Sequence, residues 1–238
     1  MYIVFHVGKS GGEGFCNFLN QNKIHHIALH VHSPKINNIN ILNNNNNNKI
    51  ILLRDPISRY MSVFYFWLRA HNYYISNKKH VHLNIVKNNI KYFSKIKTFQ
   101  DLVTELRTGG NLKNLAENLI SNMHHLRQNL SYYLGDNKII EKNKNKILFI
   151  MEQENYDKDF NDFNIFLNKK HNTPIDDNFC STILENYINQ RNSNGCKEDL
   201  YFLSEENKIF LKKYLSSEYK IYEYLKSIKE EVNGKIKK

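Results

Sequence analysis

The chain begins with a strand, a glycine-rich turn and a helix in direct succession, and this start constrains its fold most. Residues 2–7, with the sequence YIVFHV, form an apolar run that predicts a buried parallel strand. The turn GKSGGEG covers residues 8–14. Phe15, Phe18 and Leu19 then recur at helical spacing, which predicts that a helix follows at once. Such a turn presents backbone N–H groups and a helix N-terminus to an anion.

Two known phosphate-binding motifs match this turn poorly. A Walker-type NTPase loop reads Gly-x-x-x-x-Gly-Lys, and Ile3 occupies the position of its first glycine. The dinucleotide-binding fingerprint is matched only by the spacing of Gly12 and Gly14. Lys9 and Ser10 add an ammonium and a hydroxyl donor, which favours an anion site over a tight turn that binds nothing.

A second strand ends in a basic residue and leads into a helix. Residues 49–53, with the sequence KIILL, predict another buried strand, and Arg54 follows it directly. Asp55 suits the cap of the next helix and Pro56 suits its first turn. Ser62 follows eight residues after Arg54 on that helix. Arg54 therefore stands at the carboxyl end of a strand, where open α/β sheets bind their ligands.

The two segments together resemble the PAPS-dependent sulfotransferases, in particular the carbohydrate enzymes of the heparan sulfate 2-O and 6-O type. The motifs of that family read His-x-x-Lys-Thr-Gly-Gly and Arg-Asp-Pro-x-x-Arg-Tyr-x-Ser. Residues 6–12 and 54–62 are similar to them, whereas Glu13 and Gly14 stand where family members commonly have Thr or Ser. The resemblance implies a three-layer α/β fold of the P-loop-like sulfotransferase type, with a central parallel sheet flanked by helices. We expect its strands at residues 2–7, 27–32, 49–53 and 147–151.

The resemblance also implies an activity and a cofactor. The enzyme would transfer the sulfuryl group of 3′-phosphoadenosine 5′-phosphosulfate (PAPS) to a hydroxyl of a carbohydrate or other acceptor, acidic ones included, and release 3′,5′-ADP (PAP). Lys9 would stabilise the leaving group, and Arg54 with Ser62 would hold the 3′-phosphate; no metal is required. A basic loop with Arg191 or Lys197 would close over that phosphate, and a solvated loop is the alternative. The implied cofactor-binding residues are Gly8, Lys9, Ser10, Gly11, Gly12, Glu13, Gly14, Arg54, Ser62 and Arg191.

Histidines crowd the segment between the two motifs. In the resembling enzymes a histidine of this segment takes the proton of the acceptor hydroxyl, and His32, or else His30, matches that placement. Exposed histidines at a strand edge are the alternative. A zinc site is a further alternative, with His25 and His26 as added ligands, but no Cys or acidic residue joins them at ligand spacing. His124 and His125, farther along, are surface or cleft residues in this interpretation.

Composition excludes several classes of protein. The net charge of +11 invites a nucleic-acid partner, but Lys, Asn, Ile and Tyr are over-used together, as translation of an AT-rich genome would produce. We therefore expect no nucleic-acid partner. No apolar run is long enough to span a membrane, and no secretory segment opens the chain, so we expect a cytoplasmic protein or a trimmed form of a Golgi-type enzyme. Cys16, Cys180 and Cys196 are expected to be reduced thiols.

The rest of the chain fits one domain over residues 1–238, with a flexible Asn-rich loop near 37–48. We expect an irregular segment over 67–97 and one long amphipathic helix over 115–130 that ends near Gly135. Glu152 follows the strand at 147–151, and the remaining expected helices carry the residues Phe160, Phe163 and Leu167, then Ser204 to Glu206, then Tyr219 to Leu225.

Two functions from other classes stay open. A nucleotide kinase or NTPase would depend on magnesium and would place an acidic residue at the end of a strand. A degenerate member of the resembling family would bind anionic glycan without transferring sulfate, and Glu13 supports that alternative.

Overall fold

The computed structural model describes residues 1–29, 38–43, 48–77, 91–171 and 202–236. Its contacts divide the chain into two compact units. The first, which we call the sheet unit, comprises Met1–Asp55, Gln128–Gly195 and Ser217–Lys238. The second, the helical unit, comprises Pro56–Arg127 and Cys196–Ser216. The single domain expected over the whole chain stays a prediction, and each unit is described by itself.

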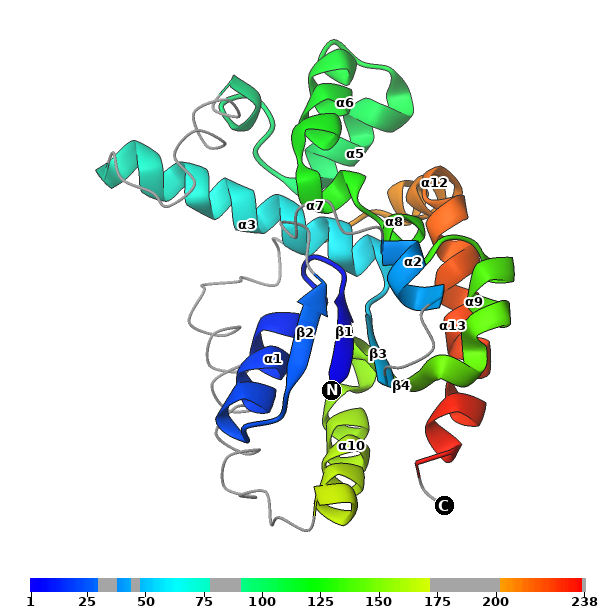
Figure 1. The fold of residues 1–238 in the computed structure, drawn as a ribbon. Coiled ribbons are helices and arrows are strands. Elements are labelled where there is room, and N and C mark those ends of the chain that lie inside the picture. Colours follow the sequence, from blue (N-terminus) through cyan, green and yellow to red (C-terminus); the bar gives the residue numbers. More distant parts are fainter. Residues whose placement is uncertain (30–37, 44–47, 78–90, 172–201, 237–238) are drawn as a thin grey trace. The chain divides into compact units, whose positions relative to one another are not determined.

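The sheet unit contains a fully parallel sheet (Figure 1). Its strands are β1 (Tyr2–His6), β2 (His26–Leu29), β3 (Asn48–Leu53) and β4 (Ile147–Glu152), in the spatial order β2-β1-β3-β4. This confirms the expected α/β class with a central parallel sheet. The strand expected over 27–32 is described only as far as Leu29, and its remainder lies outside the described residues.

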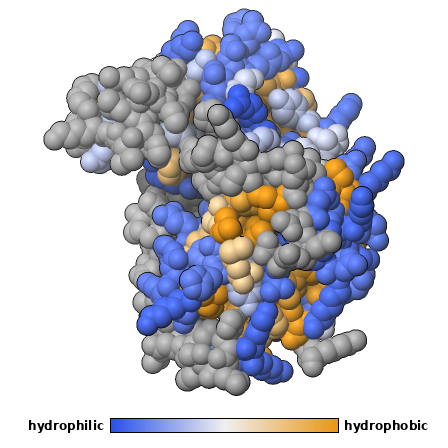
Figure 2. Space-filling model, viewed as in Figure 1, coloured by the Kyte–Doolittle hydropathy of each residue, from blue (hydrophilic) through white to orange (hydrophobic). Residues whose placement is uncertain are grey.

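Alternation along the strands divides the core between the two faces of the sheet. On one face, Ile3, Phe5 and Ile51 pack with α2 (Asn38–Asn43), α8 (Leu130–Leu134), α9 (Asn137–Asn143) and α13 (Ser216–Gly234). On the other face, Tyr2 and Val4 pack with α1 (Gly12–Gln21) and α10 (Tyr156–His171). The sheet is therefore flanked by helices on both faces. On the side shown in Figure 2, hydrophobic residues gather over the sheet and hydrophilic residues cover the helices beside it.

The helical unit contains α3 (Pro56–Asn77), α5 (Phe99–Thr108), α6 (Lys113–Asn122), α7 (His124–Arg127) and α12 (Glu205–Tyr214). Its helix ends follow capping chemistry: Thr98 and Asp101 form a capping box on α5, and Ser204 caps α12 as expected. Arg59, fully buried, donates from Nη1 to the backbone carbonyl of His125, and Tyr60 donates from its hydroxyl to the Leu126 carbonyl at 3.2 Å. These two bonds fasten the first turns of α3 to α7.

The structure corrects the expected long helix over 115–130, which is divided into α6, α7 and the start of α8. Met123 takes an extended conformation, with ψ 104°, and ends α6. Asn129 is extended too, and its side-chain oxygen accepts from the Tyr132 N–H at the start of α8. Local capping therefore breaks a run whose apolar spacing alone predicts one helix.

Two segments expected to be irregular contain helices. Residues 67–77 belong to α3, where Phe64, Trp67 and His71 are buried at helical spacing. The Asn-rich loop expected near 37–48 is interrupted by α2, because Leu42 is buried in the core. Residues 44–47 of that loop lie outside the described residues.

Candidate anion-binding site at the carboxyl edge of the sheet

The turn after β1 adopts an unusual backbone conformation at Lys9. Its φ of 68° lies in the left-handed region, which costs a non-glycine residue roughly 1–2 kcal/mol. Gly11, with φ 83°, is the N-cap of α1 and supplies no side-chain cap. The first N–H groups of any helix have no acceptor within the helix, so those of α1 are the natural donors to an anion at this turn. We name residues 7–11 the Lys9 loop.

Ser10 fixes this loop from inside. Its side chain is only 3% exposed, and its hydroxyl donates to the Val7 carbonyl at 2.6 Å. The Ser10 N–H also donates to that carbonyl, at 3.1 Å. The hydroxyl proton thus holds the turn in this structure, and the phosphate contact expected of Ser10 stays a prediction.

The first turn of α1 packs closely on the end of β1. His6 is buried, and a Cβ on Gly12 would lie 2.2 Å from its ring carbons, so only glycine fits at residue 12. Gly14 faces open space, and the Glu13 side chain is exposed in the first helical turn. An acidic residue there stabilises the helix through its dipole, which explains Glu13 without a ligand.

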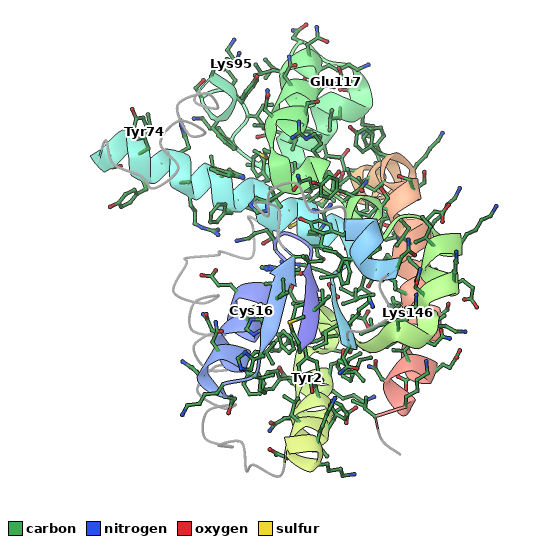
Figure 3. The ribbon with its side chains drawn as sticks, viewed as in Figure 1. Tyr2, Cys16, Tyr74, Lys95, Glu117 and Lys146 are labelled. Atoms are coloured by element: carbon green, nitrogen blue, oxygen red, sulfur yellow. The ribbon has the colours of Figure 1, made fainter. Side chains whose placement is uncertain are left out.

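Arg54 joins the two segments that the sequence predicted to bind phosphate. β1 and β3 are neighbours, with His6 opposite Leu52, so both strands end at the same edge of the sheet. Arg54 Nη1 donates to the Lys9 backbone carbonyl at 2.8 Å. Because β2 lies on the other side of β1, this is also the point where the strand order reverses, the usual ligand site of open α/β sheets. Tyr2 and Lys146, labelled in Figure 3, mark the opposite edge.

A third segment, the turn η2 (Gln153–Asn155) after β4, adjoins this edge. The Asp55 N–H donates to Glu154 Oε1 at 3.0 Å, and the Asp55 carboxylate accepts from the Tyr219 hydroxyl at 2.8 Å. A Cβ on Gly11 would lie 3.9 Å from the ring of Tyr156 and 4.0 Å from the side chain of Gln153. Sequence reasoning noted Glu152 directly after the buried strand but assigned no residue of this segment to the site.

A network of buried charged side chains surrounds Glu152, directly before η2. Glu152 accepts hydrogen bonds from four side chains: Asn155 at 2.9 Å, and Tyr222, Lys226 and Lys229 at 3.2 Å each. Lys229 also donates to Asp159 at 2.7 Å, and Asp159 accepts the Glu152 N–H at 2.7 Å.

The pKa values of the two carboxyl groups in this network are shifted in opposite directions. Burial raises the pKa of Glu152, but the hydrogen bonds from Lys226 and Lys229 outweigh it and hold that pKa below its ordinary value. Burial dominates at Asp159 and raises its pKa in spite of Lys229. The lysine bonds therefore stabilise the charged form of Glu152, whereas burial disfavours the charged form of Asp159.

Other predicted residues belong to the helical unit or lie outside the described residues. Ser62 is half-buried on α3 in the helical unit, where His125 is buried on α7. His30, His32, Arg191 and Lys197 lie outside the described residues, as does the side chain of His124. His26 Nδ1 lies 3.0 Å from the Ile24 carbonyl oxygen.

The described residues contain neither a metal-binding cluster nor a helix that could cross a membrane. No group of three His, Cys, Asp or Glu side chains is arranged there to hold a metal ion. Within the same residues, no helix has both the length and the apolar character that crossing a bilayer requires.

The fold and the site define an α/β protein with a glycine-rich, lysine-bearing loop at the carboxyl edge of a parallel sheet. None of the protein-family models, curated proteins or solved structures compared with this chain matches it. A functional assignment therefore rests on the geometry of that edge and on the two sequence motifs that meet there.

Proposed function

We propose that this protein is a PAPS-dependent sulfotransferase that acts on a hydroxyl of a carbohydrate acceptor, with the P-loop-like fold of such enzymes. One observation carries the proposal. The Lys9 loop and Arg54, 45 residues apart in the sequence, meet at the ends of two adjacent parallel strands with 2.8 Å between Arg54 Nη1 and the Lys9 carbonyl oxygen. A nucleotide with phosphates at both its 5′ and 3′ positions needs two such cationic segments close together.

The reaction requires that the reactants be positioned and that the charge on the leaving group be stabilised. The acceptor oxygen attacks the sulfur in line, the bond from sulfur to the 5′-phosphate oxygen breaks, and the electron pair leaves with 3′,5′-ADP. The Lys9 ammonium stabilises the charge that grows on that oxygen, and the first N–H groups of α1 hold the 5′-phosphate. Arg54, with Ser62 as its partner in the motif, selects the 3′-phosphate.

The acceptor proton needs a base. A neutral histidine near the attacking oxygen suits neutral pH, and we assign this role to His32, with His30 as the alternative. Both follow β2, which ends at Leu29 at the same edge of the sheet as the Lys9 loop.

The structure offers one observation in favour of a nucleotide kinase. Glu152 ends β4 opposite Leu53 of β3, which is where an NTPase keeps the acidic residue that assists its magnesium ion. The Glu152 carboxylate is buried, however, and already accepts from Lys226 and Lys229. A magnesium ion would have to displace two ammonium groups, which makes sulfuryl transfer the better-supported function.

The test is turnover of labelled PAPS over a panel of neutral and acidic glycan acceptors. We expect transfer to at least one glycan in the absence of divalent cations, and loss of transfer in Lys9→Ala. Lys23→Ala, a change at an exposed lysine after α1, serves as the control. Hydrolysis of ATP with magnesium and no sulfuryl transfer would support the kinase alternative. Glycan binding without transfer would support the degenerate member of the family.

A further inference from the structure

We infer that Arg54 is a positioning residue for the Lys9 loop, in addition to its contact with the 3′-phosphate, and that it thereby couples the two phosphate sites. The inference rests on the proposed function, because it concerns how the same site recognises its ligand. Its structural part, the hold of Arg54 on the loop, does not depend on the identity of the ligand.

The backbone of Lys9 needs an external constraint. A lysine at φ 68° persists only where its surroundings fix it, since the left-handed region is unfavourable for residues with a Cβ. The peptide unit between Lys9 and Ser10 is held at both ends. Its N–H donates to the Val7 carbonyl at 3.1 Å, and its carbonyl accepts from Arg54 Nη1 at 2.8 Å. The Ser10 hydroxyl adds a second bond to Val7, at 2.6 Å.

These bonds are not equivalent. The two bonds to Val7 are local and neutral, and they close a turn within the loop. The bond from Arg54 is charge-assisted and comes from the next strand of the sheet. The bond from Arg54 therefore relates the orientation of this peptide, and so the direction of the following N–H groups, to the end of β3.

Coupling between the phosphate sites follows from this arrangement. A guanidinium has five N–H donors, so the same group can donate both to the Lys9 carbonyl and to a phosphate. A 3′-phosphate that orients Arg54 also strengthens its hold on the loop, and linkage requires that the effect be reciprocal. Loss of Arg54 should then weaken even ligands that have no 3′-phosphate.

The first experiment measures amide hydrogen exchange in the ligand-free protein. We expect Arg54→Ala to accelerate exchange of the Ser10 N–H, while exchange in β4 and α13 stays as in the parent protein. Arg54→Lys, which keeps a charged donor, should show an intermediate rate. If Arg54→Ala does not fold, Arg54→Gln, which also lacks the guanidinium, is measured instead. Unchanged exchange at Ser10 in a folded variant without the guanidinium would overturn the inference.

The second experiment titrates 5′-AMP, which has no 3′-phosphate, and 3′,5′-ADP. We expect Arg54→Ala to weaken 5′-AMP binding by about 10-fold, the loss typical of one charge-assisted hydrogen bond, and 3′,5′-ADP binding by more. Arg107→Ala in the helical unit is the matched control and should change neither affinity. If Arg54→Ala leaves 5′-AMP affinity unchanged, Arg54 serves the 3′-phosphate alone and the coupling is refuted. If the parent protein binds neither nucleotide, the proposed function fails. The exchange experiment still tests whether Arg54 holds the Lys9 loop in place.

Discussion

The ring of His6 occupies the space that a side chain on Gly12 would need, since a Cβ there would lie 2.2 Å from the ring carbons. His6 ends β1 and Gly12 begins α1, so this contact sets how closely the N-terminus of the helix packs on the end of the strand. The geometry of the proposed 5′-phosphate site therefore depends on the absence of one methyl group.

Gly12→Ala should lower the free energy of unfolding by about 1–3 kcal/mol, because the added methyl overpacks a buried contact. It should also abolish nucleotide binding. Gly14→Ala is the matched control: nothing lies within 4 Å of its Cβ, and alanine favours a helix by about 0.5–1 kcal/mol over glycine. Urea unfolding of both variants checks this. A Gly12→Ala protein as stable as Gly14→Ala would show that the His6 ring moves aside without cost.

Lys9 and Lys23 allow a second matched comparison, since both have positive φ, 68° and 56°. Replacing either by glycine relieves the left-handed backbone, so both variants should keep the free energy of unfolding within about 1 kcal/mol of the parent protein. Lys9→Gly should lower PAPS turnover by about 10²–10³-fold through loss of the ammonium, and Lys23→Gly should leave turnover unchanged. Equal turnover in the two variants would remove Lys9 from the reaction.

Stability at acidic pH should respond oppositely to changes at Glu152 and Asp159. Glu152 has a lowered pKa, so its stabilising contribution is present above its ordinary value of 4.5 and is lost as the pH falls through the value in the folded protein. Glu152→Gln should therefore flatten the loss of stability below about pH 4.5. Asp159 has a raised pKa, so its charged form costs stability and that cost disappears on acidification. Asp159→Asn should then steepen the acid loss. Urea midpoints between pH 3 and 7 measure how stability depends on pH in each variant and in the parent protein. If both substitutions changed this dependence in the same direction, the assignment of the two carboxyl groups would be contradicted.

His32 and His30 are expected to differ in function. His32→Ala should lower turnover by about 10²–10⁴-fold, the range for loss of a general base, while affinity for 3′,5′-ADP stays within a few-fold. His30→Ala should cost much less. Full activity of the His32 variant would transfer the role to His30, or to His124 or His125. Equal losses of turnover and stability in both variants would identify a structural pair.

The sequence predicted those parts of the fold that depend on local patterns. Runs such as residues 2–7 and 49–53 are apolar enough to be strands on their own evidence, and Pro56 marks a helix start directly. The meeting of the Lys9 loop with Arg54 followed from the rule that parallel strands end at one edge, and the structure places both residues there.

The expected long helix is wrong for a local reason, because Met123 ends α6 and the Asn129 side chain caps the start of α8 through the Tyr132 N–H. The other features that the sequence did not predict depend on partners far away in the chain. Arg59 stands in the second motif, yet it is buried and bonded to the carbonyl of His125, 66 residues later. At the start of η2, Lys229 of α13 pairs with Glu152 across 77 residues. No local periodicity encodes such pairs.

Selectivity for the 3′-phosphate tests the proposed function most directly. Titration calorimetry should compare 3′,5′-ADP with 5′-AMP and with ATP in the presence of magnesium. We expect 3′,5′-ADP to bind at least about 10-fold more tightly than 5′-AMP, since a charge-assisted contact to the added phosphate contributes about 1.5–3 kcal/mol. It should also bind more tightly than ATP with magnesium. Equal affinities for 3′,5′-ADP and 5′-AMP, or tighter binding of ATP with magnesium, would contradict a PAPS-dependent sulfotransferase.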